Sequence, residues 1–394
     1  METLQPDSRP WRTVSLLLML MLGMGAFLVT WAAVCGLSMA LLDQRRFLPN
    51  LTLPMFSLIA AGNVLGLALA WQALEGLRGK PSRPFVLSPA WAAWLCLAYG
   101  VSVVAGQTVV NLKLATALTL PVFHVIALSL PPLLILWTAT ALAKNEGLTW
   151  RQMVSGLGSG AFGATGLAFA VEAALAVTGV VAVVVMLGAS SEGAERLRQF
   201  RLRLGNSMDA QFLITLLRNP AVVVALFFGL GVIVPLVEEP VKSLVPALAG
   251  INQPLTPARG FLLGVASGAG FAVLEGMLNG GLSIQGWNSV ALLRIGSTAM
   301  HCLASGLTGW GWGQVWPRRG WLRLMAAYAA ACALHGVWNS ISIGMTVVAE
   351  VLEPGSLQTA LVTLSGGLLV MLSIGALVAL MVMAKKMGRP GGAA

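Results

Sequence analysis

The chain has 394 residues, of which 57% are hydrophobic and only 10% are charged. A water-soluble domain of this length needs more polar surface, so the composition excludes a soluble globular protein and predicts a chain embedded in a membrane. The formal net charge of +10 comes from basic residues in short loops beside apolar runs. That is the pattern of charges that orient membrane proteins, and it argues against a nucleic-acid partner.

Apolar runs long enough to cross a bilayer recur along the whole chain, since a helix needs roughly 20 residues to cross about 30 Å of hydrocarbon. We predict spans at residues 13–41, 51–74, 87–110, 119–143, 153–188, 219–249, 259–280, 290–314, 321–347 and 357–384. No alternating strand pattern accompanies them, which favours helices over a β-barrel. The predicted fold is all-α, a polytopic transmembrane helix bundle of about ten spans in the lipid bilayer of the cell membrane.

The order of polar and apolar segments divides the chain into three regions. Residues 1–188 form an N-terminal transmembrane region of unassigned role, and the long, glycine-rich run 153–188 is expected to bend or to form two segments. Residues 189–218 are the longest polar stretch, with arginines among leucines, and they predict an amphipathic interfacial linker. Residues 219–394 hold almost all of the intramembrane charge and predict a catalytic transmembrane region.

The segment VIVPLVEEPVKSLVPAL places three charges inside a predicted span, where each costs a few kcal/mol or more. If the helix continues through it, Lys242 lies four residues after Glu238 and three after Glu239, on the same face as both. If a new helix begins at Pro240 instead, the two carboxylates lie at a positive helix end. Under both alternatives we expect Glu238 and Glu239 to face a protein interior or a wet cavity rather than lipid. The remaining alternative is a charged cluster at the membrane end that only closes a helix.

The next span places Glu275 on a face of small residues. That face contains Gly264, Gly268, Ala272, Glu275 and Asn279. Small residues allow close approach of a neighbouring helix, so the Glu275 carboxylate is expected to enter the packed interior. The alternative is a buried acid that only forms hydrogen bonds.

Each of the two following spans has a continuous polar stripe centred on a histidine. The stripes are Arg294, Thr298, His301, Ser305 and Thr308, and then Tyr328, Cys332, His335, Asn339 and Ser342. Polar stripes on adjacent spans avoid lipid by facing inward, so we predict that the two histidines face one another across a wet cavity. His124 and Glu172 have no such stripe and are interpreted as structural.

These residue types fit hydrolysis, because carboxylates and imidazoles activate water and amides stabilise an oxyanion. The predicted catalytic set is Glu238, Glu239, Glu275, His301, His335 and Asn339, with Lys242 and Arg294 as supporting charges. In one form of the mechanism Zn²⁺ is held by His301, His335 and one of Glu239 or Glu275, leaving a position for water. In the other, a glutamate activates water without metal and a histidine with Asn339 holds the oxyanion.

The same residues resemble the motifs of the PrsW-type intramembrane proteases, which are distantly similar to the CAAX-processing proteases. Glu238 to Lys242 resemble the EExxK motif, Phe271 to Glu275 the FxxxE motif, His301 the single-histidine helix, and His335 to Asn339 the HxxxN motif. The resemblance implies a metal-dependent protease acting on a membrane-anchored protein, as in the anti-sigma-factor cleavage of regulated proteolysis signalling. One departure is Gly276, which stands where the family usually has asparagine.

Two other functions are alternatives to the protease. An ion- or proton-coupled transporter would use the buried Glu, His and Lys cluster as a path for the ion, and it predicts internal repeats. The two halves of this chain show no such repeat. A membrane scaffold would use the same polar cluster only to hold helices together.

Overall fold

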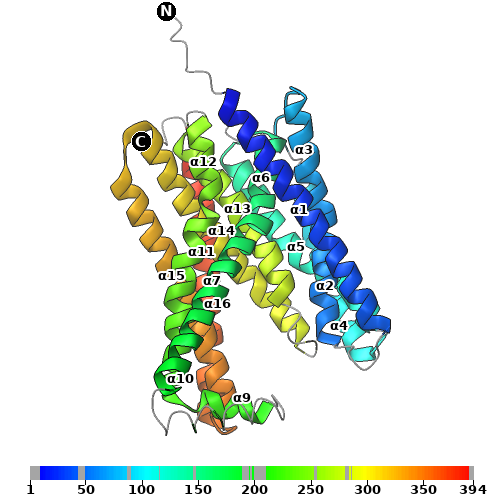
Figure 1. Cartoon of the computed structure of the whole chain (residues 1–394), viewed down its shortest axis with the longest axis vertical. Helices are drawn as coiled ribbons and strands as arrows, with labels where there is room; N and C mark the ends of the chain where they lie inside the picture. The colour runs from blue at the N-terminus through cyan, green and yellow to red at the C-terminus, as the bar shows by residue number, and fades with distance from the viewer. Residues whose placement is uncertain are drawn as a thin grey trace, which may run out of the picture.

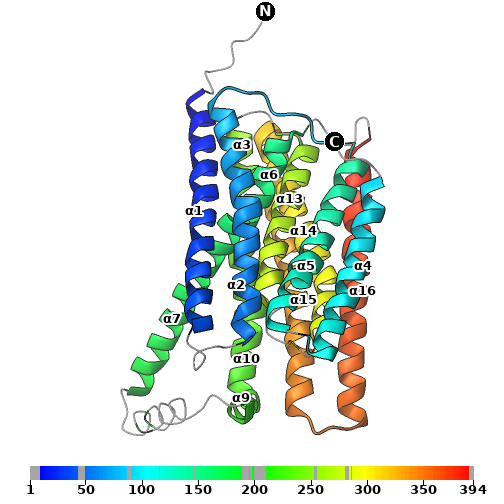
Figure 2. The ribbon, with the colours of Figure 1, turned by 90° about the vertical axis from the view of Figure 1, so that its right-hand side faces the viewer.

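The computed structural model describes residues 9–42, 49–86, 90–114, 116–144, 148–188, 195, 198, 210–252, 255–279, 284 and 286–389. Within these residues the chain is almost entirely helical, and its only β-contact is an isolated bridge between Pro84 and Thr149. Ten helical segments in the described part of the chain are long and apolar enough to span a membrane. The prediction of an all-α polytopic bundle with about ten spans is confirmed (Figures 1 and 2).

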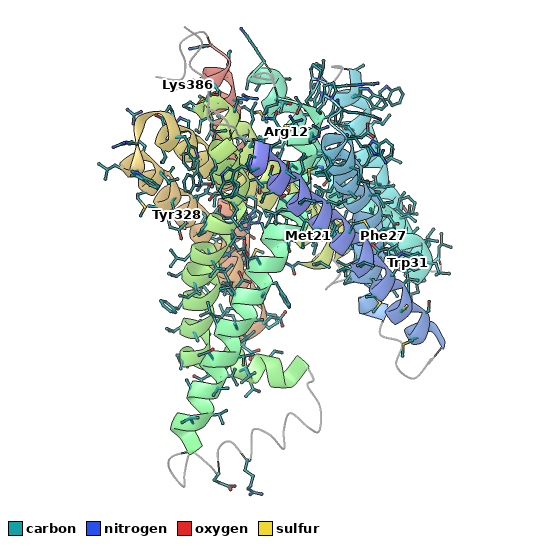
Figure 3. The ribbon with its side chains drawn as sticks, turned by 45° about the horizontal axis from the view of Figure 1, so that its top comes forward. Arg12, Met21, Phe27, Trp31, Tyr328 and Lys386 are labelled. Atoms are coloured by element: carbon teal, nitrogen blue, oxygen red, sulfur yellow. The ribbon has the colours of Figure 1, made fainter. Side chains whose placement is uncertain are left out.

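The ten spans overlap the predicted apolar runs one for one. They are Pro10–Met39, Thr52–Leu77, Ala90–Leu112, Leu118–Leu142, Trp150–Ala182, Pro220–Ile251, Pro257–Asn279, Trp287–Pro317, Trp321–Val351 and Ser356–Met387. Because their number is even, the first span begins and the last span ends at the same end of the bundle, where Arg12 and Lys386 lie (Figure 3). Side chains such as Met21 and Trp31 lie on the outer surface, as expected for contact with lipid.

Three of the spans contain a short π-helical turn. Their elements are α2 (Pro49–Ala61), η1 (Gly62–Gly66) and α3 (Leu67–Leu77); α6 (Trp150–Gly158), η2 (Ser159–Ala164) and α7 (Thr165–Gly188); and α10 (Pro220–Phe228), η3 (Gly229–Ile233), α11 (Val234–Lys242) and α12 (Leu244–Asn252). The expected irregularity in the run 153–188 is therefore the π turn η2, which lies where its glycines are concentrated. Such turns are frequent at functional sites.

The remaining helices are α1 (Arg9–Leu42), α4 (Ala90–Leu112), α5 (Thr116–Leu142), α9 (Ala210–Leu217), α13 (Pro257–Asn279), α14 (Trp287–Arg318), α15 (Trp321–Val351) and α16 (Ser356–Met387). The interfacial linker predicted at 189–218 falls largely outside the described residues, apart from positions 195, 198 and 210–218.

Helix α13 is the centre of the bundle, with 89% of its most apolar stretch buried. It packs against α14 through the glycine face predicted from the sequence. A Cβ atom on Gly264 would collide with the backbone oxygen of Ser305, and one on Gly268 would collide with that of His301. The two backbones therefore approach closely, which places Glu275 of α13 beside the histidine of α14.

Helix α11 runs without interruption through Pro240 and ends at Lys242. The chain turns at Ser243, and α12 begins at the next residue. The alternative in which a new helix begins at Pro240 is therefore wrong, and the continuous helix places Glu238, Glu239 and Lys242 on one face. A break at Pro240 was one of the two alternatives because proline removes a backbone hydrogen bond; in the structure a side chain of α15 donates to the carbonyl that Pro240 leaves unpaired.

Candidate active site

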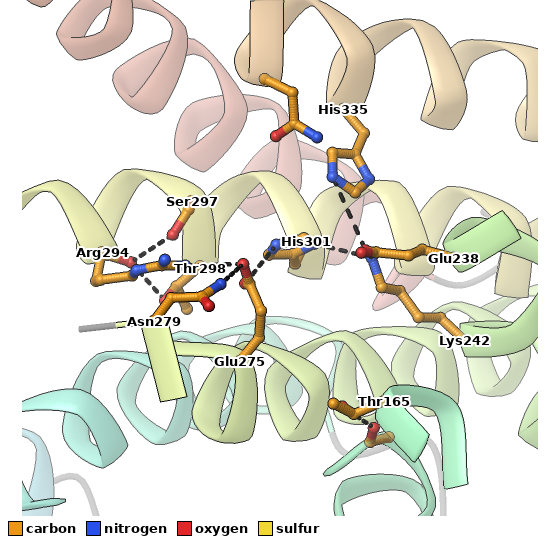
Figure 4. A network of polar contacts seen from close by, with 12 residues as sticks. Thr165, Glu238, Lys242, Glu275, Asn279, Arg294, Ser297, Thr298, His301 and His335 are labelled. Atoms are coloured by element: carbon orange, nitrogen blue, oxygen red, sulfur yellow. Dashed lines mark hydrogen bonds and ion pairs between the residues drawn. The ribbon is translucent and has the colours of Figure 1, made fainter. Parts of the chain in front are cut away.

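Four helices deliver the predicted site residues to one buried location (Figure 4). Helix α11 provides Glu238, Glu239 and Lys242, α13 provides Glu275, α14 provides Arg294 and His301, and α15 provides His335 and Asn339. The first seven form one connected network of hydrogen bonds and ion pairs. Asn339 lies one turn beyond His335 and lines the same cavity.

Lys242 is the hub of this network and is completely buried. Its Nζ atom lies 2.8 Å from Oε2 of Glu238 and 2.9 Å from Oε1 of Glu239. The third contact of Nζ, at 2.9 Å, is with Nδ1 of His301. All three ammonium hydrogens thus have an acceptor, which is the condition for burying a charge without a large desolvation penalty. The ring of Phe271 covers the remaining side, with its centroid 3.9 Å from Nζ.

Glu275 contacts His301 from the side opposite to Lys242. Its Oε2 atom lies 3.1 Å from Nε2 of His301, and its Oε1 atom lies 3.0 Å from an Nη atom of Arg294. The amide of Asn279 donates to the same Oε1 atom at 3.0 Å. The carboxylate is therefore held by three groups and orients the imidazole.

His335 approaches the glutamates from α15. Its Nδ1 atom lies 2.8 Å from Oε1 of Glu239, and its Nε2 atom lies 3.8 Å from Oε2 of Glu238. The centroids of the His301 and His335 rings are 4.9 Å apart, with the rings nearly perpendicular. The two histidines meet as predicted, but their rings are in direct contact and no cavity separates them. Three other members of the α15 stripe donate to backbone oxygens in α11 and η3 rather than to α14, namely Tyr328, Cys332 and Asn339.

A group of four side chains has the composition of a metal site. Glu238, Glu239, His301 and His335 are all buried and offer ligand atoms that lie within 4.8 Å of one another. Two imidazoles and two carboxylates are a donor set that zinc accepts. One carboxylate oxygen, Oε2 of Glu239, is buried and has no hydrogen-bond partner, so it is available to a cation. Glu275 is outside this group and instead contacts the outer nitrogen of His301.

A cavity of about 340 Å³ lies between α7, α11, α13 and α15 and borders the cluster. Glu238, Glu275, His335 and Asn339 line it, together with apolar side chains. Glu238 is slightly exposed to this cavity, with 11% of its side chain accessible, whereas the side chain of Glu239 is fully enclosed. The two adjacent glutamates therefore have different environments.

The cavity includes one acid that sequence reasoning had interpreted as structural. Glu172 of α7 lines the wall, and its Oε1 atom is buried without a hydrogen-bond partner. The feature of the sequence that could have identified Glu172 is that it is a single acid in an otherwise apolar span. The structural interpretation of His124 fits its contacts, because Nδ1 accepts from the indole of Trp287 at 2.9 Å and Nε2 contacts the carbonyl of Met277 at 2.9 Å.

Comparison with known proteins gives one result. A family model described as PrsW family intramembrane metalloprotease matches residues 148–374, which is more than half of the chain. The matched region begins just before α6, ends within α16 and contains every predicted site residue. No curated protein and no solved structure matches the chain.

Proposed function

This chain belongs to the PrsW family of intramembrane metalloproteases, and on that premise we propose that it cleaves membrane-anchored proteins at the cluster formed by α11, α13, α14 and α15. The observation that carries the proposal is the meeting of two glutamates and two histidines within 4.8 Å, beside a cavity in the spanning helices. Regulated proteolysis signalling in the cell membrane is the proposed setting. The transporter alternative is not proposed, because the family is one of proteases.

We infer that Glu239, His301 and His335 provide the ligands for the metal of this family, with Zn²⁺ as the proposed ion and one position left for water. Bound zinc would polarise the scissile carbonyl and make water a stronger nucleophile. Lys242 hydrogen-bonds to two of these ligands, Glu239 and His301, so its ammonium group has to give up those contacts when a cation binds. In this arrangement Glu275 orients His301, and Arg294 offsets the charge of Glu275.

Glu238 is the proposed general base, because it is the glutamate of the pair that borders the cavity. It would take a proton from water as the water oxygen bonds to the carbonyl carbon, and would give that proton to the amide nitrogen as the C–N bond breaks. Glu239 is enclosed and contacts Nδ1 of His335, which supports a role in holding that imidazole.

The location of the cavity supports a substrate whose scissile bond lies at membrane depth. A helical substrate hides its carbonyl groups in backbone hydrogen bonds, so the segment that enters must unwind there. Polar side chains on the cavity wall, among them Asn279 and Ser342, would then replace some of the lost backbone partners.

The test is incubation of the purified protein in bilayers with a panel of single-span membrane proteins, scored for specific cleavage. Glu238→Gln should reduce cleavage by a factor of about 100 or more, the usual contribution of a general base. Glu353→Gln, in the exposed turn before α16, is the matched control and should cleave at the parental rate. Equal cleavage by both variants would overturn the assignment of Glu238.

A further inference from the structure

Two prolines in α11 each leave a backbone carbonyl without its helical donor, one carbonyl in η3 and one in α11. An α-helical carbonyl accepts from the fourth following N–H group, and a π-helical carbonyl from the fifth. Proline has no N–H group, so Pro240 leaves the carbonyl of Leu236 without a partner. In η3 the N–H group of Val234 donates to Gly229, and the next π-helical bond, from position 235 to Leu230, is ruled out by Pro235.

Helix α15 provides a side-chain donor for each of these carbonyls. The hydroxyl of Tyr328 donates to the oxygen of Leu236 at 2.8 Å, and the amide of Asn339 donates to the oxygen of Leu230 at 2.8 Å. These contacts join segments that are 92 and 109 residues apart in sequence. In a membrane-spanning helix an unpaired carbonyl is strongly destabilising, because lipid offers no replacement donor.

The two donors flank the histidine of the site. From Tyr328 to Cys332, His335 and Asn339 the spacings are four, three and four residues, so all four lie on one face of α15. Along α15, two further contacts lie between those of Tyr328 and Asn339. Cys332 lies 3.5 Å from the backbone oxygen of Pro235, and His335 contacts Glu239. Tyr328 and Asn339 therefore fix the register of α11 against α15 on both sides of the histidine–glutamate pair.

We propose that Tyr328 and Asn339 are positioning residues that hold Glu238 and Glu239 in place by capping the carbonyls exposed by Pro240 and Pro235. The proposal rests on the function assigned above to the two glutamates. It gives Asn339, which the sequence analysis placed in the catalytic set, a role in aligning α11. It also gives a role to Tyr328, which lies outside the four motifs.

The test is a double-mutant cycle in the full-length protein purified in detergent. Tyr328→Phe removes only the hydroxyl, so it should lower the thermal midpoint and weaken Zn²⁺ binding about tenfold, the lower end of the loss usual for groups that orient ligands. Pro240→Ala restores a backbone donor for Leu236. The losses in thermal midpoint and Zn²⁺ affinity caused by Tyr328→Phe should therefore be clearly smaller in the Pro240→Ala variant than in the parental protein.

Thr346→Val is the matched control, because the Thr346 hydroxyl donates to the carbonyl of Ser342 one turn earlier in the same helix; neither measurement should change. A second cycle pairs Asn339→Leu with Pro235→Ala and covers the case in which Pro240→Ala does not fold. Equal losses from the α15 substitutions with and without the proline substitutions would overturn the proposal. The thermal midpoint requires neither substrate nor metal, so a failure of the proposed cleavage activity would leave this result interpretable.

Discussion

Lys242 and His301 are joined by a contact of 2.9 Å between Nζ and Nδ1, which determines the tautomer of the histidine. An ammonium group can only donate, so Nδ1 of His301 accepts and its Nε2 atom carries the hydrogen. That hydrogen is donated to Oε2 of Glu275 at 3.1 Å. The nitrogen of His301 that faces Glu238 and Glu239 is therefore occupied by a cationic side chain of the protein itself.

The first prediction follows from this contact and concerns Lys242→Met. Removing the ammonium group leaves Glu238 and Glu239 without their counter-charge, and breaking a buried ion pair costs about 3–5 kcal/mol. We expect a large fall in the thermal midpoint after chelation and its recovery when Zn²⁺ is added, since the same acceptors become free for the cation. The control is Lys144→Met, in the exposed turn that follows α5. A Lys242→Met midpoint that does not respond to Zn²⁺ would contradict the metal assignment.

The second prediction separates the two adjacent glutamates. Glu239→Gln removes an enclosed carboxylate that contacts both Lys242 and His335, so we expect losses in both the thermal midpoint and cleavage. Glu238→Gln changes a side chain at the cavity wall, so we expect a loss of cleavage with a smaller change in the midpoint. The measurement is thermal unfolding and cleavage on the same preparations. A larger fall in the midpoint for Glu238→Gln than for Glu239→Gln would show that the burial of the two carboxylates is wrongly assigned.

The third prediction tests the structural role of His124. Trp287→Phe removes the indole donor of its Nδ1 atom and leaves a buried acceptor unpaired, which costs about 1–3 kcal/mol before any loss of packing. We expect a lower thermal midpoint but an unchanged cleavage rate per folded molecule. Trp94→Phe, on the exposed face of α4, should change neither quantity. A specific loss of catalytic rate in Trp287→Phe would place His124 in the active site.

Composition and periodicity were sufficient to predict the fold and the meeting of the two histidines. Ten apolar runs became ten spans, because in a bilayer each spanning segment must satisfy its own backbone hydrogen bonds. The inward orientation of His301 and His335 followed from the same reasoning, since polar stripes on neighbouring spans are excluded from lipid.

What sequence reasoning left open or missed depends on contacts between distant segments. Helix α11 continues through Pro240, and the carbonyl that this proline leaves unpaired accepts from Tyr328, which lies 92 residues further along the chain. The position of Lys242 against His301 depends on how α11 packs on α14. Glu172 was interpreted as structural because its local surroundings are apolar, and only the packing of α7 near α11 and α13 brings it to the cavity.

The last prediction concerns Glu172. Its Oε1 atom is buried without a hydrogen-bond partner, and it shares a cavity with the carboxylates of Glu238 and Glu275. An unpaired acid at membrane depth near two others is destabilising, both through desolvation and through repulsion between like charges. We therefore expect Glu172→Leu to raise the stability of the folded protein by about 1–3 kcal/mol, the usual penalty for an unsatisfied buried group, measured as an increased thermal midpoint.

The matched control is Glu75→Leu, because Glu75 is also a partly buried acid in a spanning helix but is paired with Arg78 and Lys80. That substitution removes favourable contacts and should not stabilise the protein. A fall in the midpoint of Glu172→Leu would mean that the Glu172 carboxylate has a stabilising partner in the folded protein. If the midpoint rises while cleavage falls, the destabilising acid has been retained because it contacts the substrate, as expected for a group on the wall of the cavity that holds the unwound segment.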